Sequence, residues 1–252
     1  MPDRNLVQFI RVSLCGSKVA AGSPRAGREK PATRALGAER LTPIVLFAIG
    51  SPIVVEYVET CRRLCRAIGA AVKNYDGPVF FTDAAKVVGV HELTPAVTAW
   101  PCFCPLFTPA NRFAATTEAL ALGFVFPEAL IDPTAIVAST TTVGGGTFVN
   151  AGCIVGAETV IGEHVVVNRG VSIGHHAEIA AFASLGPSVV LGGHVKVGRG
   201  ATVGAGAVVL PNVEIGEHAI VGAGAVVVAG VPARTKAFGN PARIREAGLA
   251  DF

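Results

Sequence analysis

The sequence predicts two architectures in one chain, a small α/β unit over residues 43–130 followed by a parallel β-helix over residues 131–233. The first observation is the alternation of apolar runs and amphipathic segments before residue 130, which is typical of a parallel sheet with helices. The second is a strict six-residue period from Ile131 onward, which neither an α-helix nor a single strand produces. The third is composition, because 30 glycines and only 15% charged residues exclude a long helix and a disordered chain.

Composition also limits the partners that we expect. The net charge of +3 is too small to indicate nucleic acid, and no window holds eighteen uninterrupted apolar residues, so no membrane span is expected. The six cysteines lack metal or disulfide spacing, which favours free thiols in the cytoplasm and no metal site. Residues 1–42 are expected to form a flexible basic arm, with a misassigned start codon or a transit-like leader as alternatives, and residues 234–252 a C-terminal tail.

Within the α/β unit, each element follows from a local pattern. The apolar run 43–49 predicts a buried strand, followed by a turn at Gly50-Ser51-Pro52. Residues 54–71 predict a helix, because acidic residues stand early and arginines late, which matches the helix dipole. The remaining predicted elements are a second strand at 79–82 that ends at Asp83, a further strand at 104–107 and a helix at 111–122.

The six-residue period predicts how the second part of the chain winds. Seventeen positions spaced by six, from 131 to 227, all hold Ile, Val or Leu. The following residue is Gly ten times and Asp or Asn three times, which we interpret as tight corners with positive φ. The fifth residue of every hexad is Ala, Val, Thr or Cys, small enough for a narrow interior. Three hexads then close one triangular coil, and successive coils pair at about 4.7–4.9 Å.

Residues eighteen apart should therefore lie on adjacent coils. His175 and Gly193 have this spacing, which places an imidazole base beside a backbone N–H. Such a pair suits acyl transfer, because the base accepts a proton from the attacking group while the N–H stabilises the oxyanion. His176 and His194 are also eighteen apart. Four histidines occupy the fourth place of a hexad, where we expect side chains in solvent: His164, His176, His194 and His218.

At three places the sequence resembles the sialic acid O-acetyltransferase and sugar-nucleotide N-acetyltransferase family of hexapeptide acyltransferases. The matching segments are Asn168-Arg-Gly-Val-Ser-Ile-Gly-His175-His176, Phe182-Ala-Ser-Leu-Gly-Pro187 and Leu191-Gly-Gly-His-Val-Lys-Val-Gly198. The ending Gly239-Asn-Pro-Ala-Arg243 and the preceding α/β unit are also similar to that family, so the resemblance covers residues 43–245. It implies a Rossmann-like α/β subdomain, a left-handed parallel β-helix and a homotrimer with active sites between subunits. It also implies acetyl-CoA as the donor.

The resemblance implies roles for individual residues. His175 matches the catalytic base, and Gly193 matches the glycine whose N–H meets the acetyl carbonyl. Ser184 stands where the family has a histidine near coenzyme A, and Ala205 and Ala223 match backbone positions along the pantetheine. The implied acceptor contacts are Asn168, the turn residues Gly50 and Ser51, and Asp83, which matches an acid that contacts the nucleotide base.

The sequence departs from the family pattern at two positions. His176 stands where an Asp or Glu usually raises the basicity of the catalytic imidazole, so the base is either weaker or supported by Glu178 or by another subunit. The turn Gly50-Ser51-Pro52-Ile53 lacks the histidine that touches the sugar nucleotide in the family. The nucleotide-linked acceptor is therefore supported by fewer residues than the acetyl-CoA donor.

The pair of His175 and Gly193 predicts acyl transfer, and the resemblance implies an acetyltransferase that acts on an amino or hydroxyl group of a sugar, a nucleotide-linked sugar used in polysaccharide biosynthesis. Two alternatives stay open. One is a zinc hydro-lyase like the γ-class carbonic anhydrases, although the chain has no pair of histidines five apart. The other is a scaffold that keeps the coil without turnover, which His176 and the altered turn would explain.

Overall fold

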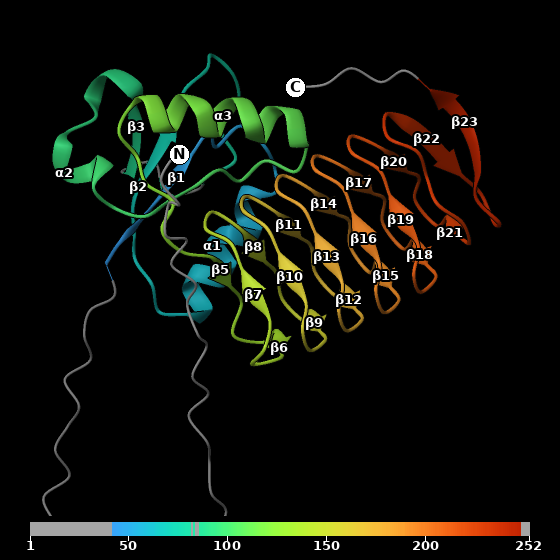
Figure 1. The fold of residues 1–252 in the computed structure, drawn as a ribbon. Coiled ribbons are helices and arrows are strands. Elements are labelled where there is room, and N and C mark those ends of the chain that lie inside the picture. Colours follow the sequence, from blue (N-terminus) through green and yellow to red (C-terminus); the bar gives the residue numbers. More distant parts are fainter. Residues whose placement is uncertain (1–41, 82, 84–85, 248–252) are drawn as a thin grey trace, which may run out of the picture.

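The computed structural model describes residues 42–81, 83 and 86–247, and it contains an α/β unit followed by a parallel β-helix (Figure 1). Nearly all of the predicted basic arm lies outside the described residues. Among those residues, no helix has the length and apolar character needed to cross a bilayer. The stacked coils form the long axis of the molecule, and the α/β unit lies at their N-terminal end (Figure 1).

The α/β unit contains a parallel sheet with the strand order β3-β2-β1-β4. Its strands are β1 (Ile44–Phe47), β2 (Ile68–Lys73), β3 (Val87–Gly89) and β4 (Cys102–Phe103). Its helices are α1 (Val54–Arg63), the 3-10 helix η2 (Val90–Glu92), α2 (Pro95–Thr98) and α3 (Pro109–Ala121). Every residue of β1 is buried, as its apolar run predicts, and α3 confirms the predicted helix at 111–122.

The predicted helix over 54–71 is wrong in its second half. Helix α1 ends at Arg63, and Cys65 turns the chain with φ of 52°. Ile68–Lys73 then forms β2, which pairs with β1. A short apolar run such as Ile68–Val72 fits a helix or a buried strand equally well by periodicity. Pairing with a fully buried neighbouring strand decides in favour of the strand.

Two predicted strands are also displaced. Residues 79–81 form no strand, Thr82 lies outside the described residues, and the third strand of the sheet is β3 instead. The strand predicted at 104–107 lies earlier, at Cys102–Phe103, because that pair matches the register of Val45 and Leu46 in β1. The acidic residue that follows the second strand is therefore Asp76 rather than Asp83.

From residue 130 the chain winds into a three-sided prism whose strands, up to residue 227, are two residues long and recur every six residues. Face 1 contains β5 (Leu130–Ile131), β8 (Phe148–Val149), β11 (Val166–Val167), β14 (Ser184–Leu185), β17 (Thr202–Val203), β20 (Ile220–Val221), β22 (Thr235–Phe238) and β23 (Arg243–Ala247). Face 2 contains β6 (Ile136–Val137), β9 (Ile154–Val155), β12 (Ser172–Ile173), β15 (Val190–Leu191), β18 (Val208–Val209) and β21 (Val226–Val227). Face 3 contains β7 (Thr142–Val143), β10 (Val160–Ile161), β13 (Glu178–Ile179), β16 (Lys196–Val197) and β19 (Glu214–Ile215).

Partners in the two-residue strands are eighteen residues apart on all three faces, for example Ile173 with Leu191, as the period predicts. The second residue of each strand and the small fifth residue of each hexad together fill the interior with Val, Ile, Leu, Ala and Cys153. Within residues 234–247, β22 continues face 1 and β23 pairs with it in antiparallel direction. The region predicted as a tail thus extends the prism.

The interpretation of the corner glycines is wrong. Positive φ occurs two residues later in every hexad from residue 146 to residue 224, at positions such as His176 and His194. The glycine that follows each aliphatic residue is required by close packing between coils: an added Cβ at Gly156 would lie 2.6 Å from the backbone nitrogen of His175, and one at Gly174 2.5 Å from that of Gly193. Small size rather than backbone freedom explains this glycine pattern.

The α/β unit packs on face 1 through a shared core. Tyr57 of α1 stacks on Phe148 of β8 with ring centroids 3.8 Å apart. Arg112 of α3 is fully buried and donates hydrogen bonds to the backbone oxygens of His164 and Phe182, at 2.7 and 2.6 Å. These contacts fix the α/β unit against the first coils of the prism.

Candidate active site

The corner between faces 2 and 3, called the 2/3 corner, holds the predicted base and its backbone partner. It consists of the residues that follow each strand of face 2, including 174–177 and 192–195. The ring of His175 lies directly over Gly193: an added Cβ at Gly193 would be 2.9 Å from Cε1 and 3.0 Å from Nε2 of that imidazole. Within the described residues, the Gly193 N–H donates no hydrogen bond to the chain. The spacing of eighteen therefore brings the His175 imidazole next to Gly193 on the adjacent coil, as predicted.

Two further imidazoles surround His175. Its Nδ1 lies 3.0 Å from Nδ1 of His176, so one of these nitrogens donates a hydrogen bond to the other. The ring of His176 stacks on His194 of the next coil, with centroids 4.8 Å apart and planes 19° from parallel. His176 and His194 have φ of 56° and 57°, and this shared conformation aligns their side chains on adjacent coils. All three histidines are exposed.

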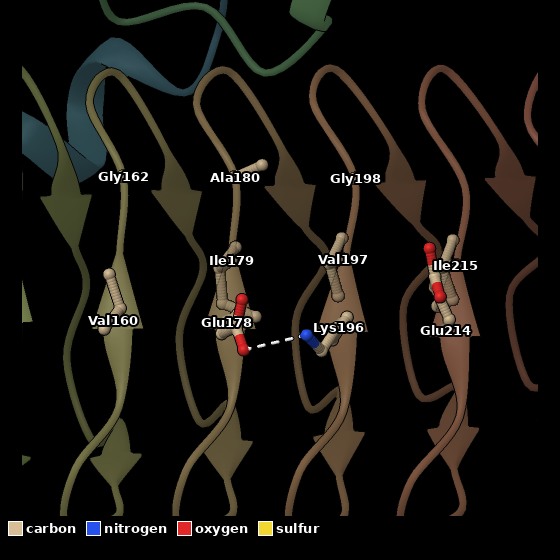
Figure 2. Close-up of a pocket in the computed structure, with 10 residues that line it drawn as sticks. All are labelled: Val160, Gly162, Glu178, Ile179, Ala180, Lys196, Val197, Gly198, Glu214 and Ile215. Atoms are coloured by element: carbon tan, nitrogen blue, oxygen red, sulfur yellow. Dashed lines mark ion pairs between the residues drawn. The ribbon is translucent and has the colours of Figure 1, made fainter.

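Glu178 does not support His175. Its carboxylate lies on face 3 and forms an ion pair of 3.0 Å with Lys196 on the neighbouring strand (Figure 2). The two side chains belong to a row across face 3 in which Val160, Glu178, Lys196 and Glu214 stand in register. Among the described residues, the polar neighbour of His175 within hydrogen-bonding distance is His176.

Ser184, predicted to lie near coenzyme A, has no exposed side chain in this subunit. Its side chain is fully buried on face 1, under the α/β unit. The hydroxyl donates to the backbone oxygen of Phe107 at 2.6 Å and accepts a hydrogen bond from Arg112 at 2.9 Å. The hydroxyl therefore stabilises the contact between the two units and is closed to a ligand.

The other predicted coil residues lie at the corner between faces 1 and 2, called the 1/2 corner. Asn168 is almost fully buried there, and its Oδ1 accepts hydrogen bonds from Asn150 at 3.1 Å and from the Arg169 N–H at 2.8 Å. Ala205 and Ala223 are exposed on adjacent coils of the same corner. The structure does not bring them to His175, because face 2 separates the two corners.

Of the predicted acceptor contacts in the α/β unit, the structure brings Gly50 to a pocket. This pocket of about 320 Å³ lies at the carboxyl ends of β1, β2 and β4, and it is lined by Ala48, Gly50, Asn74, Tyr75, Leu106, Asn111, Ala114, Ala115 and Glu118. The Asn74 amide donates to the Glu118 carboxylate at 2.6 Å. The Tyr75 ring occupies the space that a side chain at Gly50 would need. Crevices at this edge of a parallel sheet are the usual place for nucleotides.

Ser51 and Asp83 are not among the residues that line this pocket. The Ser51 backbone oxygen accepts a hydrogen bond from the Val54 N–H at the start of α1. Asp83 is half exposed and pairs with Lys86 at 3.4 Å. The role of Asp83 rested on the strand predicted at 79–82, and residues 79–81 form no strand. Asn74 and Tyr75 occupy the corresponding place after β2.

Comparisons with known proteins agree with this fold. The family described as bacterial transferase hexapeptide (six repeats) matches residues 194–229. No curated protein matches the sequence. Among solved structures, PerB from Caulobacter crescentus in complex with CoA and GDP-perosamine is 30% identical, with a TM-score of 0.73 over 81% of this chain and 98% of that one.

The chain belongs to the left-handed β-helix hexapeptide acyltransferases. The acetyltransferase domain of PglB from Neisseria gonorrhoeae, in complex with acetyl coenzyme A, is 26% identical with a TM-score of 0.72 over 81% of this chain and 99% of that one. The predicted fold class and enzyme class of this hexapeptide acyltransferase are confirmed, and so is acetyl-CoA as its cosubstrate. The roles of its individual residues stay predictions.

Sequence reasoning missed the gathering of three histidines in this acyltransferase. It treated His194 as a solvated side chain, yet a ring nitrogen of His175, of His176 and of His194 all lie within 4.8 Å of one another. The available signal was the spacing of eighteen between His176 and His194, which stacks their rings. The missed pocket residues Asn74 and Tyr75 gave no such signal, because their place depends on where β2 ends.

Proposed function

We propose that this hexapeptide acyltransferase transfers the acetyl group of acetyl-CoA to an amino group of a nucleotide-linked sugar, with His175 as general base. The observation that carries the proposal is the contact between the His175 imidazole and Gly193 on the next coil. It is supported by PerB, which was solved with CoA and GDP-perosamine. A hydroxyl acceptor would use the same base, and a panel of amino-sugar and hydroxy-sugar acceptors separates the two.

The proposed reaction is a direct transfer. Nε2 of His175 accepts a proton from the acceptor nitrogen as that nitrogen bonds to the thioester carbonyl carbon. The Gly193 N–H stabilises the negative charge that develops on the carbonyl oxygen. The carbon–sulfur bond then breaks, and coenzyme A leaves as a thiol after taking the proton from the imidazolium. No covalent intermediate on the protein is required.

His176 positions the base in this proposal. With His176 neutral, its Nδ1 accepts a hydrogen bond from Nδ1–H of His175, which leaves the Nε2 lone pair of His175 free for the proton. This contact fixes the tautomer and the orientation of the ring, as a carboxylate would. It supplies no negative charge, so it stabilises the imidazolium less than an Asp or Glu would.

The pocket in the α/β unit is the proposed place for the nucleotide. The Tyr75 ring offers a surface for base stacking, and the Asn74 and Glu118 side chains offer hydrogen-bonding groups. The α/β unit covers face 1, whereas His175 lies at the 2/3 corner. We therefore infer that an acceptor held in this pocket meets a histidine of a neighbouring subunit.

A homotrimer would provide that neighbour. Face 2 carries the exposed apolar side chains Ile136, Ile154 and Val190, with exposed fractions of 66%, 51% and 41%. Three prisms that turn face 2 toward a common axis bury this surface and bring the 2/3 corner of one subunit against the 1/2 corner of the next. His175 and Gly193 would then face Ala205 and Ala223 of a neighbouring subunit, which completes a groove for coenzyme A.

Both substrates are cytoplasmic metabolites, so we place this reaction in the cytoplasm, where it would supply polysaccharide biosynthesis.

The test is an assay of free thiol with acetyl-CoA and a panel of amino-sugar and hydroxy-sugar nucleotides. We expect thiol release with an amino-sugar nucleotide and its loss in His175→Ala, with both proteins showing the same circular dichroism and the same mass in solution. Equal rates for the two proteins would favour the scaffold alternative. Thiol release with hydroxy-sugar nucleotides alone would assign O-acetylation.

A further inference from the structure

The three-histidine cluster, formed by His175, His176 and His194, offers three imidazole ligands that could hold one metal ion. One ring nitrogen from each residue lies within 4.8 Å of the others. In a tetrahedral zinc site with Zn–N bonds of about 2.0–2.1 Å, neighbouring nitrogens are about 3.4 Å apart. The His175 and His176 Nδ1 atoms are already 3.0 Å apart, so small ring rotations would complete a three-nitrogen site.

The backbone holds the cluster in place. His176 and His194 share the left-handed conformation on adjacent coils, so their side chains leave the prism in the same direction. The same column continues with Glu158 on the preceding coil and Asn212 on the following coil, at φ of 58° and 62°. Exposed carboxylate and amide groups thus flank the histidines along the prism axis. Such groups can orient imidazole ligands or bind a water molecule on the metal.

The chemistry of the three imidazole groups determines which class of cation this cluster would bind. Neutral imidazoles suit late first-row divalent ions such as Zn²⁺, Co²⁺ and Ni²⁺, whereas Mg²⁺ and Ca²⁺ require oxygen ligands. A site of three histidines leaves one position open for water or an added ligand. It differs from the zinc hydro-lyase arrangement considered above, because all three ligands come from one chain and two are adjacent in sequence.

We propose that His175, His176 and His194 bind one zinc ion per chain and that its binding stops acetyl transfer. The inhibitory part rests on the proposed role of His175 as the base. A neutral imidazole has one lone pair, so whichever His175 nitrogen binds the metal, the other carries a hydrogen and cannot accept a proton. Zinc binding would therefore remove the base while the fold stays intact, and a chelator would restore it.

The binding test uses the full chain without a histidine tag, stripped of metal by a chelator. Equilibrium dialysis against Zn²⁺ should give one ion per chain, and Co²⁺ should give the visible absorption of a tetrahedral complex. His194→Asn should weaken binding at least tenfold, and Asn tolerates the left-handed conformation at this position. His91→Asn removes an exposed histidine of the α/β unit and should leave binding unchanged. No binding, or equal binding by wild type and His194→Asn, would overturn the metal site.

The activity test separates this inference from the proposed function. Saturating Zn²⁺ should abolish acetyl transfer by the wild type, whereas the rate of His194→Asn, compared with its own zinc-free rate, should resist zinc at the same concentration. If zinc binds as expected and transfer continues at full rate, the inhibitory claim and the assignment of His175 as base both fail. If transfer needs His175 and zinc does not bind, only the metal proposal fails.

Discussion

Two corners of the prism place histidines at the same backbone position and use them in opposite ways. At the corner between faces 3 and 1, called the 3/1 corner, His164 has φ of 54° and is 8% exposed. At the 2/3 corner, His176 and His194 have nearly the same φ and are exposed. The difference arises from what covers each corner, since the α/β unit packs over the first and leaves the second open. Local conformation thus sets the direction of a side chain, and the neighbouring unit sets its chemistry.

The covered corner is built as a structural contact. The His164 ring stacks on Phe182 and meets Phe126 edge-on, with centroids 4.8 Å away in each case. Arg199 lies 4.9 Å above the Phe182 ring. Burial, together with the charges of Arg112 and Arg199, lowers the pKa of His164 to about 4. This histidine is therefore neutral at pH 7 and acts as a flat packing group.

The largest expected effect is on activity at the open corner. His175→Ala should lower kcat about 10²–10⁴-fold, the usual contribution of a general base, while the thermal unfolding midpoint stays unchanged because the side chain is exposed. Steady-state thiol release and a melting curve measure the two quantities, with His91→Asn as the control. A large loss of stability in His175→Ala would show that the side chain at the open corner also stabilises the fold.

At the covered corner the expected effect is on stability. Arg112→Ala removes the hydrogen bonds to the backbone oxygens of His164, Phe182 and Ala183, and it leaves the His164 oxygen without a donor among the described residues. We expect a loss on the order of 3–5 kcal/mol in the free energy of unfolding. Urea denaturation measures it. The control Arg62→Ala breaks an exposed ion pair with Glu59 and should cost less than about 1 kcal/mol. Equal losses in the two variants would contradict the assigned role of Arg112.

The covered corner should also make stability depend on pH. The pKa of His164 is about 4 in the folded chain, against 6.5 for a free histidine side chain, so the unfolded chain binds the proton more readily. The contribution of neutral His164 is complete above pH 6.5 and falls by up to about 3 kcal/mol as the pH drops to 4. Urea denaturation between pH 7 and 4 should show this slope, and His164→Asn should reduce it. An unchanged slope in the variant would assign the dependence to other groups.

The smallest expected effect is a steric change at the open corner. Gly193→Ala would place a methyl group 2.9–3.0 Å from the His175 ring and push the base aside. We expect kcat/KM to fall about 10–100-fold with little change in stability, because the displaced group is an exposed side chain. Gly230→Ala is the matched control, since its Cβ would meet only the Glu214 backbone oxygen at 3.6 Å. Equal rates in the two variants would show that His175 takes no part in the reaction.

The amino-acid sequence determined the coil and its register almost completely. Every strand pairing between the two-residue strands of the prism joins residues eighteen apart, so a period counted along the chain becomes a spatial pairing, and the pair of His175 and Gly193 follows from it. The same arithmetic could have placed His194 against His176. The period does not state where positive φ falls within a hexad, which is why the role of the corner glycines was misread.

Tertiary packing decided the structural features that the six-residue period does not specify. Ile68–Lys73 became a strand because a buried partner strand was available, and the pocket residues Asn74 and Tyr75 follow from where that strand ends. The Ser184 hydroxyl is buried, and His164 lost its predicted exposure, because the α/β unit covers face 1 and the 3/1 corner. In a repeating segment, the spacing along the chain specifies which residues pair with one another. Contacts between two different units depend instead on complementary surfaces, which form only after both units have folded.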